Sequence, residues 1–535
     1  MSGNKIIKGV AVLGVAGLIV KLLGAVFRIP LQGMIGEEGM AYYGYAYPLY
    51  SFFLVVATAG IPVAISRLVS EKIALKNYAG AHKVFRVSSW LLLGIGTFAF
   101  CICFFGAELI AKYAIEDMGA VKPLKAIAPA LIFVSVMSAF RGYFQGRQNM
   151  NPTALSEFAE QVVRVCTGLF LAYYFMDKSL ESAAAGATFG ATAGSIAGLV
   201  IIFLIYLGNK RAIRYNIKRH RRSAVKESSA SIIKQILIIA IPITIGSSIL
   251  PLINAADSMI VPRRLMSSGF SLEEARILWG QLSGYCATMA GLPQAVTQAV
   301  AVAMVPAIAA AFKLNDKKEV NESINLGMRA SMIIGMPCAI GIMVLAEPIL
   351  LLLFPKNPAG VANAAPTLMI MCVGVAFMAI LQTTTGILQG IDKQMLPVKN
   401  LAIGGVVKIV ATYIFVGIPF INIKGASMGS IFVYAIAFFL NLRDVKRYTG
   451  VKIDNVQVFV KPIIVSALMG VSAFASYRLI YMVAESNTIA TLGAIFVGVV
   501  VYGFLILATK TITKAEIGKL PKGDKMVKTL DKFIK

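Results

Sequence analysis

Two cationic side chains, Lys21 and Arg28, stand seven residues apart in the first long apolar run of the chain. Seven residues make about two turns of an α-helix, so both side chains would lie on one face. A charge in the hydrocarbon core of a membrane costs about 2.5–3.5 kcal/mol on insertion scales, and it therefore faces a cavity or a partner. The pair predicts a cationic wall for an anionic ligand. The alternative is that both side chains snorkel to an interface.

A second polar stripe, formed by Glu157, Glu160 and Arg164, crosses an apolar run near residue 166. Glu160 and Arg164 have the i, i+4 spacing of a helical ion pair, which would neutralise part of the stripe. The sequence leaves two interpretations open. The stripe forms a structural ion pair between helices, or it lines the cavity as a polar or ion-coupling site.

Asp257 is a carboxylate in the middle of a later apolar run, where Ser247, Asn254 and Ser258 share its face. A carboxylate at such a depth has to be paired, protonated or bound to a cation. We therefore expect either that Asp257 and Asn254 form a site for a coupling cation, Na+ or H+, or that Asp257 forms a salt bridge with Lys21 or Arg28.

Arg263 and Arg264 follow at the predicted outer end of the same helix. Because a guanidinium group binds phosphate through two parallel N–H donors, the two arginines are a candidate phosphate clamp. The alternative is that they are ordinary loop charges balanced by Glu273 and Glu274.

Residues that catalysis or metal binding would need are sparse. The two histidines, His82 and His220, fall in predicted cytoplasmic loops, and no P-loop motif GxxxxGK[ST] occurs. The six cysteines lie in predicted spans without the spacing of a metal site. We predict no catalytic residue, no resident metal or cofactor and no disulfide, and thus a carrier driven by a coupling cation or the membrane potential rather than an enzyme.

Long apolar helices must position these groups. Of the 535 residues 58% are hydrophobic and 14% charged, whereas a soluble domain has about 25% charged residues. Apolar runs long enough to cross a bilayer, about 20 residues each, number fourteen, and the eleventh contains Lys408. The predicted fold class is an all-α integral membrane protein with 14 transmembrane helices.

The basic residues indicate the orientation. The net charge is +26, and Lys and Arg gather in alternate connecting segments, which predicts a multi-pass cell-membrane protein with both termini in the cytoplasm. In a soluble protein this charge would indicate nucleic acid. Here we predict that it faces anionic membrane lipids, and that the protein binds no nucleic acid.

A repeat links the two halves of the chain at an offset of 244 positions. Gly142, Gln145, Gly146 and Arg164 recur as Gly386, Gln389, Gly390 and Lys408, and Pro62 recurs as Pro306. The repeat predicts two pseudo-symmetric six-helix lobes with a substrate site between them near the bilayer midplane. Pro62 and Pro306 are the predicted hinges for rocking of one lobe against the other.

The predicted domains follow from this repeat. They are an N-terminal lobe (1–208), a basic cytoplasmic linker with an interfacial helix (209–232), a C-terminal lobe (233–450), two further spans (451–510) and a basic cytoplasmic tail that suits an amphipathic helix (511–535).

The segments FRGYFQGRQNMNPTALSEFAEQVVRV (140–165) and NAADSMIVPRRL (254–265), together with this arrangement of spans, resemble the stage V sporulation protein B and lipid II flippase (MurJ-like) branch of the MOP flippase superfamily. The resemblance covers nearly the whole chain. It implies an arginine-lined, V-shaped cavity that receives the diphosphate of an undecaprenyl-linked sugar on the cytoplasmic side and releases it outside. It also implies that Lys21 and Arg28 are the cationic positions of the first span and that residues 457–509 form a groove for the lipid tail.

The chain departs from the family in its eighth span. Where the family has an essential arginine, this sequence has Tyr285, Cys286, Ala287 and Thr288. Arg263 and Arg264 are the candidates to supply the missing charge.

The expected function is translocation of an undecaprenyl-pyrophosphate-linked cell-wall precursor, with lipid II as the first candidate, by alternating access. The alternatives are export of another lipid-linked polysaccharide repeat unit and multidrug or ion antiport, although a cation exporter should have acidic cavity residues. A membrane glycosyltransferase would need a catalytic acid in a large outer loop, and the predicted outer loops are short. The expected partners are the anionic glycolipid and membrane lipids, and a monomer is favoured.

Overall fold

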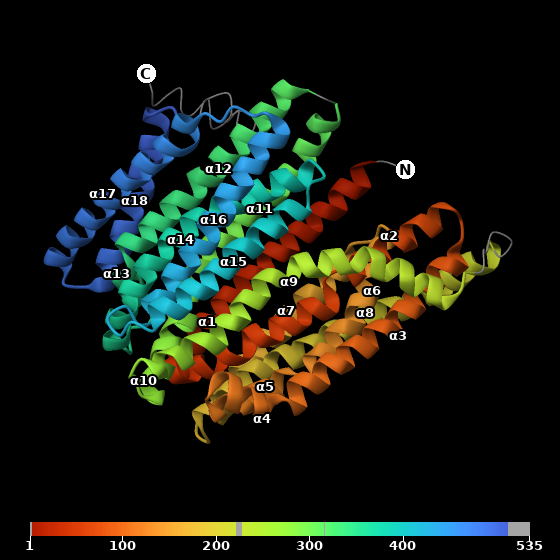
Figure 1. Ribbon diagram of the computed structural model, residues 1–535, viewed down its shortest axis with the longest axis horizontal. Coiled ribbons are helices and arrows are strands. Elements are labelled where there is room, and N and C mark those ends of the chain that lie inside the picture. The colour runs from red at the N-terminus through yellow and green to blue at the C-terminus, as the bar shows by residue number, and fades with distance from the viewer. Residues whose placement is uncertain (1–2, 221–226, 315, 512–535) are drawn as a thin grey trace. The chain divides into compact units, whose positions relative to one another are not determined.

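The computed structural model describes residues 3–220, 227–314 and 316–511, and their side chains except those of 3–19, 21, 22 and 25. Every regular element in these ranges is a helix, which confirms the all-α fold class (Figure 1). The predicted tail helix lies outside the described residues. The helices are α1 (Gly3–Thr58), α2 (Ile61–Ala74), α3 (Tyr78–Phe105), α4 (Ala107–Leu109), η1 (Ile110–Ile115), η2 (Met118–Ala120), α5 (Val121–Ile127), α6 (Ala130–Gly146), α7 (Asn151–Phe175), α8 (Leu180–Arg219), α9 (Ser229–Ser267), α10 (Leu272–Gly280), η4 (Gln281–Cys286), α11 (Ala287–Lys313), α12 (Lys317–Val344), α13 (Ala346–Leu353), α14 (Pro358–Gly390), α15 (Met395–Val416), α16 (Lys424–Thr449), η5 (Val456–Val460), α17 (Lys461–Ala484) and α18 (Asn487–Ala508).

Twelve segments among the described residues are long and apolar enough to cross a membrane. The protein is therefore a multi-pass membrane protein, but this criterion does not confirm the predicted count of fourteen. The difference lies in two places. The first two predicted spans share α1, and α7, whose polar stripe interrupts its apolar residues, is not among the twelve.

Helix α1 reverses direction at Gly36, whose φ of 65° and ψ of −165° are not helical. In a straight helix 19 residues span about 28 Å, yet the Arg28 guanidinium lies 5.9 Å from the ring centre of Tyr47. The two halves of α1 must therefore pack side by side as a helical hairpin. Glycine suits this turn because a positive φ is strained for other residues.

The chain divides into two compact units. The first comprises Met1–Ala295 and Val398–Val433, and the second comprises Val296–Pro397 and Tyr434–Lys535. The chain passes from one unit to the other within α11, α15 and α16. This division does not follow the lobes predicted from the repeat, which stay a prediction.

A row of glycines on α8 brings that helix against α7 in the first unit (Figure 1). An added Cβ at Gly190 would lie 2.6 Å from the carbonyl oxygen of Arg164, and one at Gly194 would lie 2.4 Å from that of Glu160. Such spacing allows helix backbones to approach closely inside a membrane. The row thus fixes α7, which carries the polar stripe.

The repeated glycines make the same kind of contact in both units. On α6, Gly142 approaches the Pro62 carbonyl oxygen of α2, so an added Cβ would lie 2.8 Å from it. On α14, Gly386 approaches the Ala301 carbonyl oxygen of α11 at a corresponding 2.7 Å. The fourth predicted span of each repeat therefore packs on the backbone of the second, as a true structural repeat requires.

The two predicted hinge prolines lie in different surroundings. Pro62 occupies the first turn of α2, directly after a helix break at residues 59–60, whereas Pro306 lies within the continuous helix α11. In the break, the Gly60 N–H donates to Thr244 Oγ1 of α9 at 3.2 Å. The hinge role stays a prediction for both.

The start of the predicted linker and the final pair of predicted spans are helical. Residues up to Arg219 continue α8 as one 40-residue helix, and residues 221–226 of the predicted linker lie outside the described residues. In the second unit α17 and α18 pack against each other, and α17 contacts α12 (Figure 1). The lipid-tail groove assigned to residues 457–509 stays a prediction.

Candidate functional site

Two arginines and a tyrosine form a cluster in the first unit. The Arg28 guanidinium of the first half of α1 lies 5.9 Å from the Tyr47 ring centre, and the Arg164 guanidinium of α7 lies 4.9 Å from it. Tyr43 stacks on Tyr47 with a centroid distance of 5.4 Å. Arg28, Tyr47 and Arg164 are half-buried. Cation–π attraction holds both guanidinium groups near the Tyr47 ring.

Glu160 does not form the predicted pair with Arg164. Its Oε2 accepts from Arg141 Nη2 of α6 at 2.8 Å, and Arg141 Nε also donates to Ser156 Oγ at 3.0 Å. The polar stripe thus provides the interhelical ion pair that was one of its two interpretations. Glu157 is half-buried one turn earlier. Arg164 is left to contact the aromatic cluster with its charge uncompensated by Glu160.

Asp257 has a partner that differs from the two expected. Its Oδ2 lies 2.6 Å from Lys408 Nζ of α15, and both side chains are largely buried. Asp257 therefore forms a salt bridge with Lys408, and its predicted roles as an ion-coupling site or as a partner of Lys21 or Arg28 stay predictions. The side chain of Lys21 lies outside the described residues. Asn254, one turn away on α9, is exposed.

Arg263 and Arg264 point to different partners. Arg263 Nε lies 2.9 Å from Glu116 Oε1, while Arg264 Nε donates to the Tyr413 carbonyl oxygen at 3.0 Å. Their role as a phosphate clamp stays a prediction. Of the acids named in the alternative, Glu274 is held by Ser271 in the capping box of α10, whereas Arg263 pairs with Glu116.

A polar belt at the predicted outer ends of the helices was not expected. Asp117 accepts two hydrogen bonds from Arg276, at 2.6 Å and 2.9 Å. Nearby, Gln281 Nε2 donates to Glu37 Oε1 at 3.2 Å. Their numbers differ by 244, the offset of the repeat, so the two residues hold equivalent positions in its two copies. The repeat was therefore the signal in the sequence that linked them.

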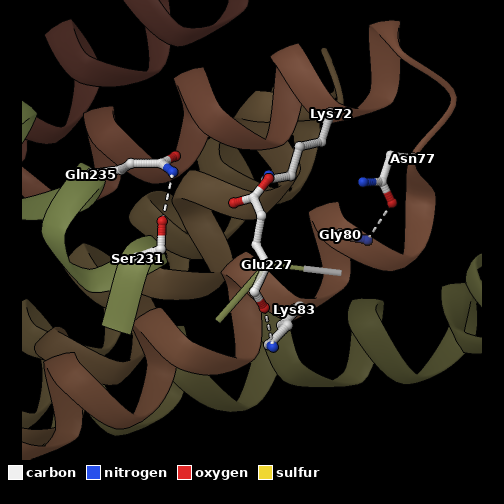
Figure 2. Close-up of polar contacts among 7 residues, drawn as sticks. All are labelled: Lys72, Asn77, Gly80, Lys83, Glu227, Ser231 and Gln235. Carbon is white, nitrogen blue, oxygen red and sulfur yellow. Dashed lines mark hydrogen bonds and ion pairs between the residues drawn. The ribbon is translucent and has the colours of Figure 1, made fainter. Parts of the chain in front are cut away.

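A second unexpected polar group lies near the end of α2 and the start of α3, where Glu227 precedes α9 (Figure 2). The Glu227 carboxylate pairs with Lys72, and the Glu227 carbonyl oxygen accepts from Lys83. Lys72 is buried, although nothing in its sequence surroundings distinguishes it from other basic residues. This group fastens the start of α9 to the first repeat.

Residues 285–288, which the resemblance matches to the family's eighth-span arginine, lie where η4 leads into α11. Tyr285 and Cys286 are buried within η4, a π-helical stretch that leads into α11. Such stretches are frequent at functional sites, but no cation stands among residues 285–288.

The comparison with family models decides the family. The model described as polysaccharide biosynthesis protein matches residues 6–312, which is more than half of the chain. The chain belongs to the polysaccharide biosynthesis protein family. The MatE model matches residues 283–414 in addition.

Two relatives are similar to this chain along most of their length. Stage V sporulation protein B of Bacillus subtilis is 27% identical over 527 residues, covering 97% of this chain and 98% of the relative. Lipid II flippase MurJ of Bacillus subtilis is 27% identical over 485 residues, covering 88% of each.

Solved structures agree on the fold. Lipid II flippase MurJ in an inward closed conformation has a TM-score of 0.62 at 16% identity, covering 93% of this chain and 98% of that one. An inward-facing multidrug resistance MATE transporter of the MOP superfamily has a TM-score of 0.67 at 14% identity, covering 82% and 98%. The chain thus shares its fold with these membrane transporters.

Proposed function

We propose that this protein is a flippase that moves an undecaprenyl-pyrophosphate-linked cell-wall precursor, with lipid II as the first candidate, from the cytoplasmic to the outer leaflet of the cell membrane by alternating access. Both termini lie in the cytoplasm in this proposal. The observation that carries it is the placement of Arg28 and Arg164 on one aromatic ring within membrane helices of the first unit.

The chemistry of this cluster favours a polyanion. A diphosphate that leaves water needs fixed cations and donors to replace its hydration, and guanidinium groups supply both through paired N–H donors. Glu160, the nearest acid of the same stripe, is already neutralised by Arg141. The positive charge of Arg28 and Arg164 therefore remains available to an anion, and Lys21 stays a predicted cation of the same site.

The same arrangement argues against the multidrug and ion antiport alternative. An exporter of organic cations needs acidic groups free to bind them, and two of the three acids of the predicted polar sites, Glu160 and Asp257, are paired with Arg141 and Lys408. Export of another lipid-linked polysaccharide repeat unit stays the second candidate, because the description of the matching family favours it and its diphosphate is chemically the same.

The energy source in this proposal is the membrane potential or a coupling cation. A substrate with negative charge moves outward with the help of a potential that is negative inside, at about 2.3 kcal/mol per charge for 100 mV. If Na+ or H+ also contributes at Asp257, it has to compete with the ammonium group of Lys408.

The test is the leaflet distribution of labelled lipid II in vesicles with and without the protein. We expect transfer that needs the protein, and a loss of at least about tenfold in Arg28→Gln and Arg164→Gln, since one charge-assisted hydrogen bond is worth about 1.5–3 kcal/mol. Arg478→Gln is the matched control, because Arg478 also stands over an aromatic ring of a membrane helix but in the second unit. Normal transfer by the Arg28→Gln, Arg164→Gln double variant would refute the role of the cluster.

A further inference from the structure

We propose that Asp117 and Arg276, together with Glu116 and Arg263, form the outer gate of the transport path, and that each transport cycle breaks both ion pairs. This inference rests on the alternating access of the proposed function. It assigns to these four residues a mechanical role that the substrate cluster does not explain.

Asp117 is built into this position from two sides. Its side chain is 1% exposed, and its oxygens accept from Arg276 Nε at 2.6 Å and Nη2 at 2.9 Å. Asp117 Oδ1 also accepts from the Gly119 N–H at 2.9 Å, which caps the short helix η2. A bidentate guanidinium–carboxylate pair combines strength with fixed geometry.

An aromatic layer lies against this ion pair. The Arg276 guanidinium stands 5.3 Å from the ring centre of Tyr42, and Tyr45 stacks on Trp279 with a centroid distance of 6.2 Å. Tyr42, Tyr45 and Trp279 are each at most 5% exposed. The layer joins α1 to α10 beside the ion pair, so these two helices are held together at this end in this structure.

The distribution of charge over the repeat distinguishes a gate from ordinary helix packing. Both acids belong to the segment between α3 and α5 of the first repeat, and both arginines belong to α9 and α10 of the second repeat. The neighbouring pairs Lys125–Glu108 and Lys122–Glu181 join elements within the first repeat. Rocking of the repeats must separate the former pairs and can leave the latter intact.

The second ion pair of the gate offers a direct test, because Arg263 and Glu116 are 59% and 39% exposed and so accessible to reagents. In a protein without the six native cysteines, Glu116→Cys and Arg263→Cys would be bridged with a short bifunctional thiol reagent that is released by reduction. We expect the bridge to block transfer of labelled lipid and reduction to restore it.

The control bridges Glu108→Cys to Lys125→Cys, the pair that joins elements of one repeat. We expect this bridge to leave transfer unchanged. A protein bridged between residues 116 and 263 that transfers lipid at the normal rate would overturn the gate.

A measurement without substrate separates the gate from the identity of the lipid. Ser283 lies beside the aromatic layer and donates to the Met40 carbonyl oxygen at 3.3 Å, so Ser283→Cys reports water entry from outside through an impermeant thiol reagent. We expect Asp117→Asn, which keeps an oxygen to cap Gly119, to raise the labelling rate several-fold, and Glu108→Gln to leave it unchanged. Equal rates in folded Asp117→Asn and its parent would contradict the proposal. Raised labelling in a protein that does not move lipid II would instead sustain the gate and reject that substrate.

Discussion

Lys408 Nζ lies 2.6 Å from Asp257 Oδ2, and only 3% and 14% of the two side chains are exposed. Asp257 is the single acid of α9. The ammonium group of Lys408 supplies the cation that this buried carboxylate requires. Removing one partner of a buried ion pair costs about 3–5 kcal/mol because it leaves an uncompensated charge, whereas removing both together can be nearly neutral. The two residues should therefore behave as one unit.

We expect Asp257→Asn and Lys408→Met each to lower the thermal stability of the purified protein, by about 3–5 kcal/mol. The double variant should be more stable than either single variant, because neither charge is then left alone. Unfolding of the three variants in one detergent measures the coupling. Additive losses in the double variant would show that the two groups do not interact.

Lys408→Met should also make the protein sensitive to ions. Once its tethered cation is lost, the Asp257 carboxylate has to take up a proton or a small cation. We expect the stability and the lipid transfer of Lys408→Met to recover at low pH or with Na+ in place of a large organic cation. The parent protein should respond much less, and an equal response of both would contradict this role of Lys408.

Tyr47 should contribute to binding through its ring rather than its hydroxyl group. A cation–π contact is worth about 0.5–2 kcal/mol, so loss of the ring should weaken a step that depends on Arg28 and Arg164 by about 2- to 30-fold. We expect Tyr47→Phe to transfer lipid nearly normally and Tyr47→Leu to lose activity in this range. A normal rate for Tyr47→Leu, measured at matched protein levels, would exclude the contribution.

The glycine contacts of the two repeats should be equally sensitive. In Gly142→Ala and Gly386→Ala the new methyl group would lie less than 3 Å from a backbone carbonyl oxygen, so both variants should be destabilised. Gly94→Ala is the control, because nothing lies within 4 Å of its added Cβ, and a helix favours alanine over glycine by about 0.8–1 kcal/mol. Melting temperatures of the three variants provide the comparison, and a tolerated Gly142→Ala would mean that α2 and α6 can move apart.

Hydropathy and the repeat predicted the fold class because both act through long, regular stretches of sequence. They could not predict the hairpin within α1, since one glycine with a positive φ replaces a recognisable loop at Gly36. They predicted that the chain crosses the membrane many times, but not the number of spans. Helix α7 remains ambiguous because its three charged residues interrupt an apolar helix of ordinary length.

The site was harder to predict because partners come from distant parts of the chain. The charges of Arg28 and Arg164 within apolar runs mark both residues in the sequence. The i, i+4 spacing predicts a pair of Glu160 with Arg164, but Glu160 pairs instead with Arg141 of another helix. Lys408 was visible as the repeat counterpart of Arg164, yet only the packing of α15 on α9 places it against Asp257. Asp117 and Arg276 lie in connecting segments, where no periodicity marks a residue as buried.

The hydrogen bond between Gln281 and Glu37 bears on the origin of the chain. The two residues occupy the same place in the two copies of the repeat, so in a symmetric dimer of identical half-length chains this position would meet itself across the two-fold axis. Two ionised glutamates would repel there. A single chain that contains both copies can have the acid in one copy and the amide in the other, as Glu37 and Gln281 do here. The present donor–acceptor pair therefore depends on the difference between the two copies of the repeat.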